Sequence, residues 1–183
     1  MSKEKESQSN DVNRVLTITT PDIENGLGNR VTIWFAGCSH HCPGCHNQHT
    51  WNYNQGQLLM SEHVLEKIYA EVENEYIEGI TLSGGDPLSR TDKQLDELTE
   101  FLVEFRKRFP KKNVWIYAGD TFEEAICNQH KENVLKQCDV MVDGEFKIDL
   151  KDQDLAFRGS SNQRIINSKK SLSTRKASVM RIK

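Results

Sequence analysis

The chain has 183 residues and a formal net charge of −3, from 27 acidic and 24 basic side chains. This length is typical of one domain with a substantial apolar core. No run approaches the roughly 18 consecutive apolar residues that a membrane span requires, so we expect no membrane-spanning helix and no membrane partner. The charged N-terminal segment MSKEKESQSND lacks the apolar stretch of a signal peptide, and we therefore expect a cytoplasmic protein whose thiols stay reduced.

Strands and helices are predicted to alternate between two polar ends. Each predicted strand is a run of β-branched and aromatic residues, and each predicted helix begins near a Ser or Thr that can cap it. In chain order we expect a strand at 30–37, a helix at 61–74, a strand at 79–85, a helix at 91–109, a strand at 113–119, a helix beginning at Thr121 and a strand at 139–146, with loops at 53–60 and 147–163. This alternation predicts α/β units around a parallel sheet, either open or curled toward a barrel.

The two ends are expected to lie outside a single domain that spans residues 13–164. Residues 1–12 are predicted to be a flexible extension. Every charged residue after Asp154 is basic, and the Ser- and Lys-rich segment 165–183 is typical of a disordered tail. A basic tail can bind nucleic acid, but no aromatic residue follows Phe157 to stack on bases. We therefore expect no nucleic-acid partner.

Polar or glycine-rich residues follow each of the first three predicted strands. These segments read GCSHHCPGC, SGGDPLS and AGDT. In α/β folds, ligands bind in the loops at the carboxyl ends of the strands. We therefore expect the cysteines and the double glycine to share one rim of the sheet.

The three clustered cysteines admit several interpretations. Cys38, Cys42 and Cys45 would share one face of a helix, but Pro43 and Gly44 fall inside that helix and would break it. The segment CPGCH also has the spacing of a c-type haem site and of a thioredoxin-like dithiol. Both of these interpretations leave Cys38 without a role.

A metal site accounts for all three cysteines. A structural zinc takes four ligands, and the fourth could be a histidine among His40, His41, His46 and His49. A 4Fe–4S cluster is normally held by four thiolates. Three thiolates leave one iron without a protein ligand, which suits a cluster that binds a substrate. The spacing of the cysteines leaves both metals open.

The segment SGGDPL, residues 83–88, is the second candidate motif. Adjacent glycines at a strand end let a ligand approach the backbone closely, because neither glycine has a Cβ. The same segment also fits an ordinary turn from a strand to a helix.

The spacing C-x3-C-x2-C after the first predicted strand, with Gly-Gly-Asp-Pro after the second, resembles the radical S-adenosylmethionine superfamily. Further stretches resemble one branch of it, the activating proteins of anaerobic ribonucleoside-triphosphate reductase. They are DIENGLGNR (22–30), CPGCHNQHTW (42–51), LSGGDPL (82–88), VDGEF (142–146) and FRGSSNQR (157–164). The resemblance keeps its order from about residue 21 to residue 164 and covers most of the chain.

The resemblance implies a fold and a set of cofactors. The fold would be a single-domain incomplete (βα) barrel, with a parallel sheet and outer helices. Cys38, Cys42 and Cys45 would hold a 4Fe–4S cluster, and the open iron would bind S-adenosyl-L-methionine. The cofactor contacts implied by the same motifs are Gly44, Cys45, His46, Gly84, Gly85 and Asp86.

The resemblance also implies a reaction. The cluster, reduced by flavodoxin or a similar donor, would cleave S-adenosylmethionine to methionine and a 5′-deoxyadenosyl radical. That radical would take a hydrogen atom from a backbone glycine of the reductase. No catalytic side chain is implied beyond the cluster and its cofactor. Cys127 and Cys138 fall outside the motif, and we expect them to be ordinary helix or loop cysteines.

Three other functions fit part of the pattern. An activase of pyruvate formate-lyase would share the cluster motif, but its last cysteine typically follows a bulkier residue than Gly44. A radical enzyme acting on a small molecule would share it as well. A zinc-binding interaction module would use the same cysteines with one histidine.

Overall fold

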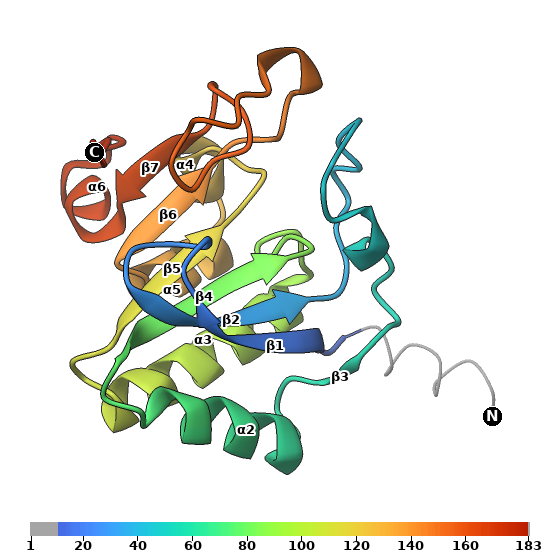
Figure 1. Ribbon diagram of the computed structural model, residues 1–183, viewed down its shortest axis with the longest axis vertical. Helices are drawn as coiled ribbons and strands as arrows, with labels where there is room; N and C mark the ends of the chain where they lie inside the picture. The colour runs from blue at the N-terminus through green and yellow to red at the C-terminus, as the bar shows by residue number, and fades with distance from the viewer. Residues whose placement is uncertain (1–10, 183) are drawn as a thin grey trace.

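A seven-stranded mixed sheet forms the centre of the computed structural model, which describes residues 11–182. Residues 1–10 of the predicted flexible extension lie outside the described residues. Across the sheet the strands are β3 (Gln57–Leu58), β1 (Arg14–Asp22), β2 (Asn29–Phe35), β4 (Ile77–Gly84), β5 (Asn113–Tyr117), β6 (Val140–Asp143) and β7 (Arg164–Asn167) (Figure 1).

The four strands predicted from the sequence, β2, β4, β5 and β6, run parallel to one another. Antiparallel strands complete the sheet on both sides, with β1 and β3 beyond β2 and with β7 beside β6. The predicted α/β class is therefore confirmed. No strand was predicted before residue 30, because the apolar residues of β1 are few and alternate with threonines.

The three predicted helices are present, and two further helices that were not predicted follow them. The helices are α2 (Glu62–Val72), α3 (Asp92–Arg108), α4 (Phe122–Ala125), α5 (Gln129–Lys136) and α6 (Ser168–Thr174), with short 3-10 turns η1 (Gln48–Thr50) and η2 (Ile148–Leu150). Thr91 and Thr121 each form a capping box with the residue three positions later, Gln94 and Glu124. Each box satisfies backbone N–H groups that the first helical turn leaves free. Among residues 11–182, no helix is long and apolar enough to cross a membrane.

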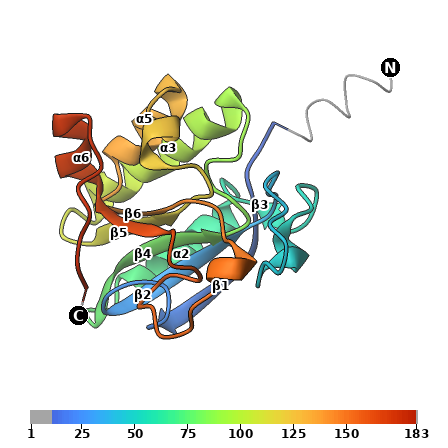
Figure 2. The same cartoon turned by 90° about the horizontal axis from the view of Figure 1, so that it is seen from above.

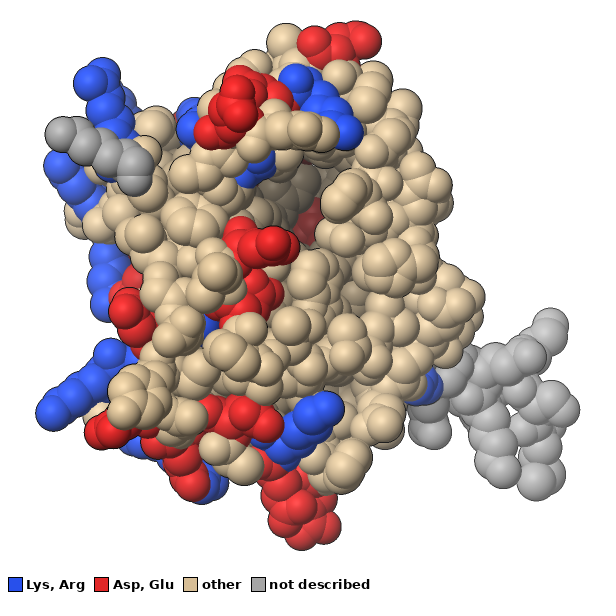
Figure 3. All heavy atoms as spheres, in the orientation of Figure 1, with Lys and Arg blue, Asp and Glu red and all other residues tan. Residues whose placement is uncertain are grey.

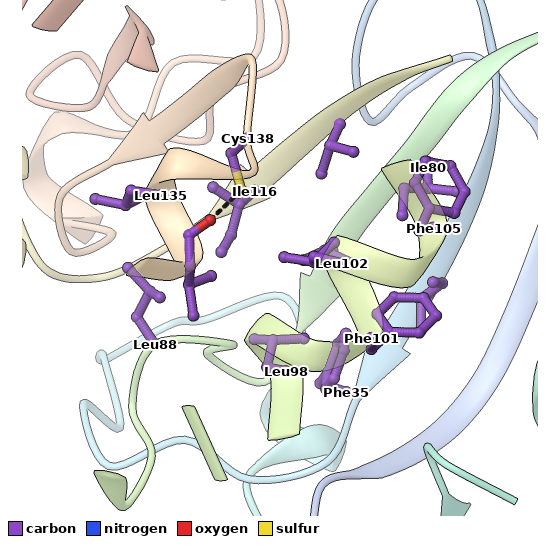
Figure 4. Packing of buried hydrophobic residues seen from close by; sticks show 14 of the residues in the cluster. Phe35, Ile80, Leu88, Leu98, Phe101, Leu102, Phe105, Ile116, Leu135 and Cys138 are labelled. Carbon is purple, nitrogen blue, oxygen red and sulfur yellow. Dashed lines mark hydrogen bonds between the residues drawn. The ribbon is translucent and has the colours of Figure 1, made fainter. Parts of the chain in front are cut away.

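The helices bury one face of the sheet. Alternate strand residues point to opposite faces, and Ile33, Leu82 and Ile116 belong with α2, α3 and α5 to one apolar cluster. Figure 2 shows α3, α5 and α6 on one side of the sheet and the loop after β6 on the other. Figure 4 shows the packing of this cluster, in which Leu102 of α3 has no exposed surface.

The other face of the sheet carries a different set of residues. Arg30, Thr81 and Ser83 occupy the positions that alternate with the apolar ones, and all three are buried. A small second cluster of Trp115, Val140, Val142 and Ile165 lies farther along the same face. We call this side, away from the helices, the open face.

The segment from residue 165 was predicted to be a disordered tail, but the structure contains a strand and a helix there. Ile165 and Ile166 are buried in β7, which pairs with β6, and α6 follows directly. The chain then returns beside β7 through a bridge between Ile166 and Val179. Polar composition concealed these contacts because two isoleucines, one facing each side of the sheet, are sufficient to add an edge strand.

Candidate functional site

One cavity of about 560 Å³ lies at the carboxyl ends of the parallel strands, under the loop that follows β6. This volume is in the range of pockets for small ligands. Figure 3 shows this side of the molecule hollowed, with Asp and Glu side chains at the margin. All the residues predicted to bind the cluster or S-adenosylmethionine line it, namely Cys38, Cys42, Gly44, Cys45, His46, Gly84, Gly85 and Asp86.

A tight turn brings two of the three cysteines together. The Cys45 N–H donates to the carbonyl oxygen of Cys42 at 3.1 Å, with Pro43 and Gly44 at the two central positions. Gly44 has a φ of +72°, as expected for glycine after proline in a type II turn. A Cβ at Gly44 would also lie 2.8 Å from the Cδ1 of Ile148, in the loop after β6. The glycine is therefore needed for both the turn and the contact.

The three thiols are free and only half-buried. Burial raises the pKa of Cys38 and that of Cys42, so both are protonated at neutral pH in the absence of metal. The N–H of Asn47 donates to the Cys45 sulfur at 3.4 Å. Over residues 11–182, no group of three or more His, Cys, Asp or Glu side chains is already arranged to hold a metal ion.

The donor set nevertheless fits an iron–sulfur cluster. Three thiols lie on one loop, line one cavity and are within reach of solvent. Binding of metal would deprotonate them, as it does for other cysteine ligands. The adjacent backbone N–H at Asn47 is of the kind that hydrogen-bonds to ligand sulfur and tunes a cluster.

The double glycine allows two loops to meet backbone to backbone. The Gly85 N–H donates to the Phe35 carbonyl oxygen at 2.8 Å, and the Asp86 N–H donates to that of Gly37 at 2.9 Å. A Cβ on Gly85 would lie 2.2 Å from the Gly37 oxygen, well inside contact distance. This packing sets the start of the cysteine loop directly against the SGGDPL segment.

The side chain of Asp86 is a structural brace between three loops. It is 4% exposed and accepts hydrogen bonds from the N–H groups of Leu88 at 2.7 Å and Gly119 at 2.9 Å, and it pairs with His40 at 2.8 Å. Burial acts to raise the pKa of Asp86, but its bonds with His40 and with the two N–H groups lower it overall. The cofactor contact predicted for Asp86 is one through its backbone, and the carboxylate is committed to these partners.

His40 joins the cysteine loop to the loops after β4 and β6. Its Nε2 lies 2.8 Å from the Asp86 carboxylate, and its Nδ1 lies 2.8 Å from that of Glu145. The bond to Asp86 is the main reason that the pKa of His40 rises to about 9, so the ring is charged at neutral pH. His40 was predicted only as a possible zinc ligand, but both of its ring nitrogens are hydrogen-bonded to carboxylates. His41 stacks on Trp51 instead, with ring centroids 4.6 Å apart.

Sequence reasoning missed the residues that complete the cavity. Trp34, Ser83 and Tyr117 reach it from the open face, and Phe157 and Arg158 reach it from the loop after β6. The first three have a sequence signal, because they alternate with the core residues of predicted strands. The loop residues belong to the stretch FRGSSNQR that carries the resemblance, but only the folding of 144–163 over the sheet brings them to the cavity.

The two cysteines outside the motif take no part in the cavity. Cys138 is buried in the core, where its Sγ donates to the carbonyl oxygen of Val134 at 3.4 Å (Figure 4). Cys127 is exposed, and its Sγ donates to the Glu123 carbonyl oxygen at 3.2 Å. Both contacts are those of ordinary helix cysteines, as predicted.

Comparison with known proteins gives a consistent assignment. Residues 24–166 match the family model described as a 4Fe-4S single cluster domain. Proteins named anaerobic ribonucleoside-triphosphate reductase-activating protein are 40% identical in Salmonella typhi and 38% identical in Escherichia coli K12, each over 78% of this chain and 90% of the relative. The protein of that name from Enterobacteria phage T4 is 38% identical over 79% of this chain and 87% of its own length. The chain therefore belongs to the 4Fe-4S single cluster domain family and, within it, to the anaerobic ribonucleoside-triphosphate reductase-activating proteins.

Proposed function

We propose that this chain activates anaerobic ribonucleoside-triphosphate reductase through a 4Fe–4S cluster held by Cys38, Cys42 and Cys45, with S-adenosyl-L-methionine as the second cofactor. The observation that carries the proposal is the shared cavity, which all the implied cluster and cofactor residues line. Its volume and its position at the carboxyl ends of parallel strands are those of a small-molecule site.

The cofactors would supply the radical chemistry. One electron from the reduced cluster would cleave S-adenosylmethionine to methionine and a 5′-deoxyadenosyl radical, which would take a hydrogen atom from a glycine of the reductase. The chain would supply position and exclusion of water. We propose no catalytic side chain beyond the cluster and cofactor, because hydrogen-atom transfer needs no acid or base.

The role of each motif in this proposal follows from its contacts. The turn through Gly44 sets Cys42 beside Cys45, and His40 fixes the loop that carries all three thiols. Gly84, Gly85 and the backbone of Asp86 would contact the methionyl part of the cofactor at the same rim. His46, exposed next to the last cysteine, would lie near the cofactor as well.

The open sheet supports the proposal of a protein substrate. β3 and β7 form two separate edges, so the sheet does not close on itself. We propose that it is the incomplete barrel of the radical S-adenosylmethionine fold. An unclosed barrel leaves a side through which a glycine-bearing loop of the reductase could enter. Reduced flavodoxin, or a similar donor in the cytoplasm, would supply the electron.

The experiment begins with purification in the absence of oxygen and assays of iron, sulfide and zinc. Dithionite and S-adenosylmethionine are then added, and 5′-deoxyadenosine is measured. We expect four irons and four sulfides per chain, as a 4Fe–4S cluster requires, and release of 5′-deoxyadenosine. Stoichiometric zinc with no 5′-deoxyadenosine would overturn the proposal in favour of the zinc-binding interaction module.

The choice of partner needs a separate test. The reduced protein is mixed with S-adenosylmethionine and either the reductase or pyruvate formate-lyase, and the glycyl radical is recorded by electron paramagnetic resonance. We expect a signal with the reductase only. A signal with pyruvate formate-lyase and none with the reductase would show that the partner is wrong.

A further inference from the structure

A half-buried arginine lies behind the cysteine loop, outside the cavity described above. Arg90 follows the SGGDPL segment and directly precedes α3. Its guanidinium carbon lies 5.2 Å from the centre of the Tyr53 ring and 5.9 Å from that of Phe35. Its Nε and Nη2 are buried, and neither has a hydrogen-bond partner among the described residues. Among the described residues, this guanidinium therefore has no carboxylate or carbonyl partner at these two nitrogens.

Tyr53 and Ser89 connect Arg90 to the two residues that flank Cys38. A Cβ on Gly37 would lie 2.1 Å from the Tyr53 ring on which Arg90 stacks. On the other side of Cys38, Ser39 binds Ser89, with the two Oγ atoms 2.6 Å apart and the Ser39 N–H donating to the Ser89 Oγ at 3.2 Å. The segment 89–90 is thus fixed on both sides of the first cysteine.

Asp86 is the one carboxylate in the described part of the chain whose charge acts on Arg90. Burial lowers the pKa of Arg90, while electrostatic interactions with Asp86, Tyr53 and Cys38 oppose that shift. A guanidinium nevertheless stays protonated in proteins. Asp86 already serves His40 and two N–H groups. A buried charge without a partner is costly, and an anion bound to the cysteines would reduce that cost.

A cluster held by three thiolates is such an anion, and its reduction potential depends on nearby charge. We propose that Arg90 is a positioning residue that compensates the negative charge of the cluster and raises its reduction potential, without acting as a ligand. The inference rests on the proposed function. A fixed cation near Cys38 favours the state with one more electron, because added negative charge is attracted to it.

The test compares variants that separate the charge of Arg90 from its packing. Arg90→Met removes the charge and keeps a long side chain against the two rings, whereas Arg90→Lys keeps a positive charge. Arg108→Met is the matched control, because Arg108 stacks on Tyr69 and Phe109 at the other end of α3. Each variant is purified without oxygen, its iron is assayed and its thermal unfolding is recorded. The midpoint potential of its cluster is then measured by redox titration with electron paramagnetic resonance.

We expect the potential of Arg90→Met to shift to more negative values, that of Arg90→Lys to stay close to wild type and that of Arg108→Met to be unchanged. Loss of the cluster in Arg90→Met alone, with Arg90→Lys loaded at the wild-type potential, supports the proposal as well. A fully loaded Arg90→Met with the wild-type potential overturns it. Equal shifts, or equal cluster loss, in the Met and Lys variants also overturn it, because packing would then be responsible.

The wild-type measurement distinguishes this inference from the proposed function. A wild-type chain that binds zinc and no iron overturns both. If the wild-type chain binds the cluster and the Met and Lys variants of Arg90 behave alike, the role of Arg90 is overturned. The proposed function then stays intact.

Discussion

The two faces of the sheet differ in what covers them and in what their side chains do. The helix-covered face is filled by apolar residues such as Ile33, Leu82 and Phe105, which have no exposed surface. The open face carries polar residues, with buried Arg30 held by Thr81 Oγ1 at 2.5 Å and the Ile80 carbonyl oxygen at 2.5 Å. The cavity and the cysteine loop adjoin this second face.

The comparison indicates how stability and function are divided in the molecule. Burial of apolar area supplies most of the free energy of folding, and the helix-covered face contains the larger cluster. The rim around the cavity depends instead on individual hydrogen bonds and tight glycine contacts. Changes on one face should therefore alter stability, and changes at the rim should alter cofactor binding.

The largest effect should follow from Cys42→Ala at the rim. We expect loss of the 4Fe–4S cluster and of S-adenosylmethionine cleavage, because the remaining two thiolates cannot hold the cluster. The free energy of unfolding of the metal-free protein should change by less than about 0.5 kcal/mol, since the thiol is only half-buried. Iron assay and urea unfolding measure the two quantities. Loss of secondary structure in the circular dichroism spectrum would mean that the residue is structural.

Leu102→Ala should give the opposite result on the helix-covered face. Leu102 has no exposed surface, and truncation of such a residue costs about 2–5 kcal/mol through lost burial and the cavity left behind. Below the unfolding transition, iron content should match that of the wild-type protein. The measurement is urea unfolding of the metal-free chain together with iron assay of the loaded chain. A Leu102→Ala protein with wild-type stability but half the wild-type iron content would contradict the proposed division of roles between the two faces.

His40→Ala should have a smaller effect, on both the free energy of unfolding and the retention of the cluster. The substitution leaves the buried Asp86 carboxylate with two donors and frees Glu145. A lost charge-assisted bond to a buried group costs about 1–3 kcal/mol. We also expect faster loss of iron to a chelator, because the cysteine loop loses its brace. The control is His63→Ala, an exposed histidine on α2, and equal rates of iron loss in the two variants would contradict the assigned role.

The smallest effect should come from Asp139, beneath α6, and it should disappear in acid. Burial acts to raise the pKa of Asp139, but bonds from Lys169 at 2.7 Å, Arg106 at 2.5 Å and the Val114 N–H at 2.8 Å lower it overall. A lowered folded-state pKa means that its stabilisation is present above the unfolded value of about 3.9 and is lost as the pH falls through the folded value.

Unfolding of wild-type protein and of Asp139→Asn should be compared between pH 7 and pH 3. We expect the difference in free energy of unfolding to be largest at neutral pH and to shrink below about pH 4. A difference that stays constant over this range would show that Asp139 acts through its shape and not through its charge.

Local patterns along the chain were sufficient for the main elements. Apolar periodicity and caps predicted the four parallel strands and the helices α2 and α3, and Thr121 with Glu124 forms the box that its spacing indicated. These signals are local because a strand or a helix satisfies its backbone within a few residues and shows its buried face as a period. β1 and β7 were missed because each carries few apolar residues, and pairing with a neighbouring strand decides the rest.

The sequence likewise showed the cysteine spacing and the double glycine. The turn between Cys42 and Cys45 could be predicted because it depends only on Pro43 and Gly44. The tertiary structure alone decided which groups meet across the rim. Asp86 and His40 are 46 positions apart, and Arg90 reaches Tyr53 from a different loop. The sequence predicted a backbone role for Asp86, and only the fold shows that its buried carboxylate joins three loops. The sequence therefore determined the elements and the thiols, and long-range packing determined which charges are paired and which, like that of Arg90, have buried nitrogens without a hydrogen-bond partner among the described residues.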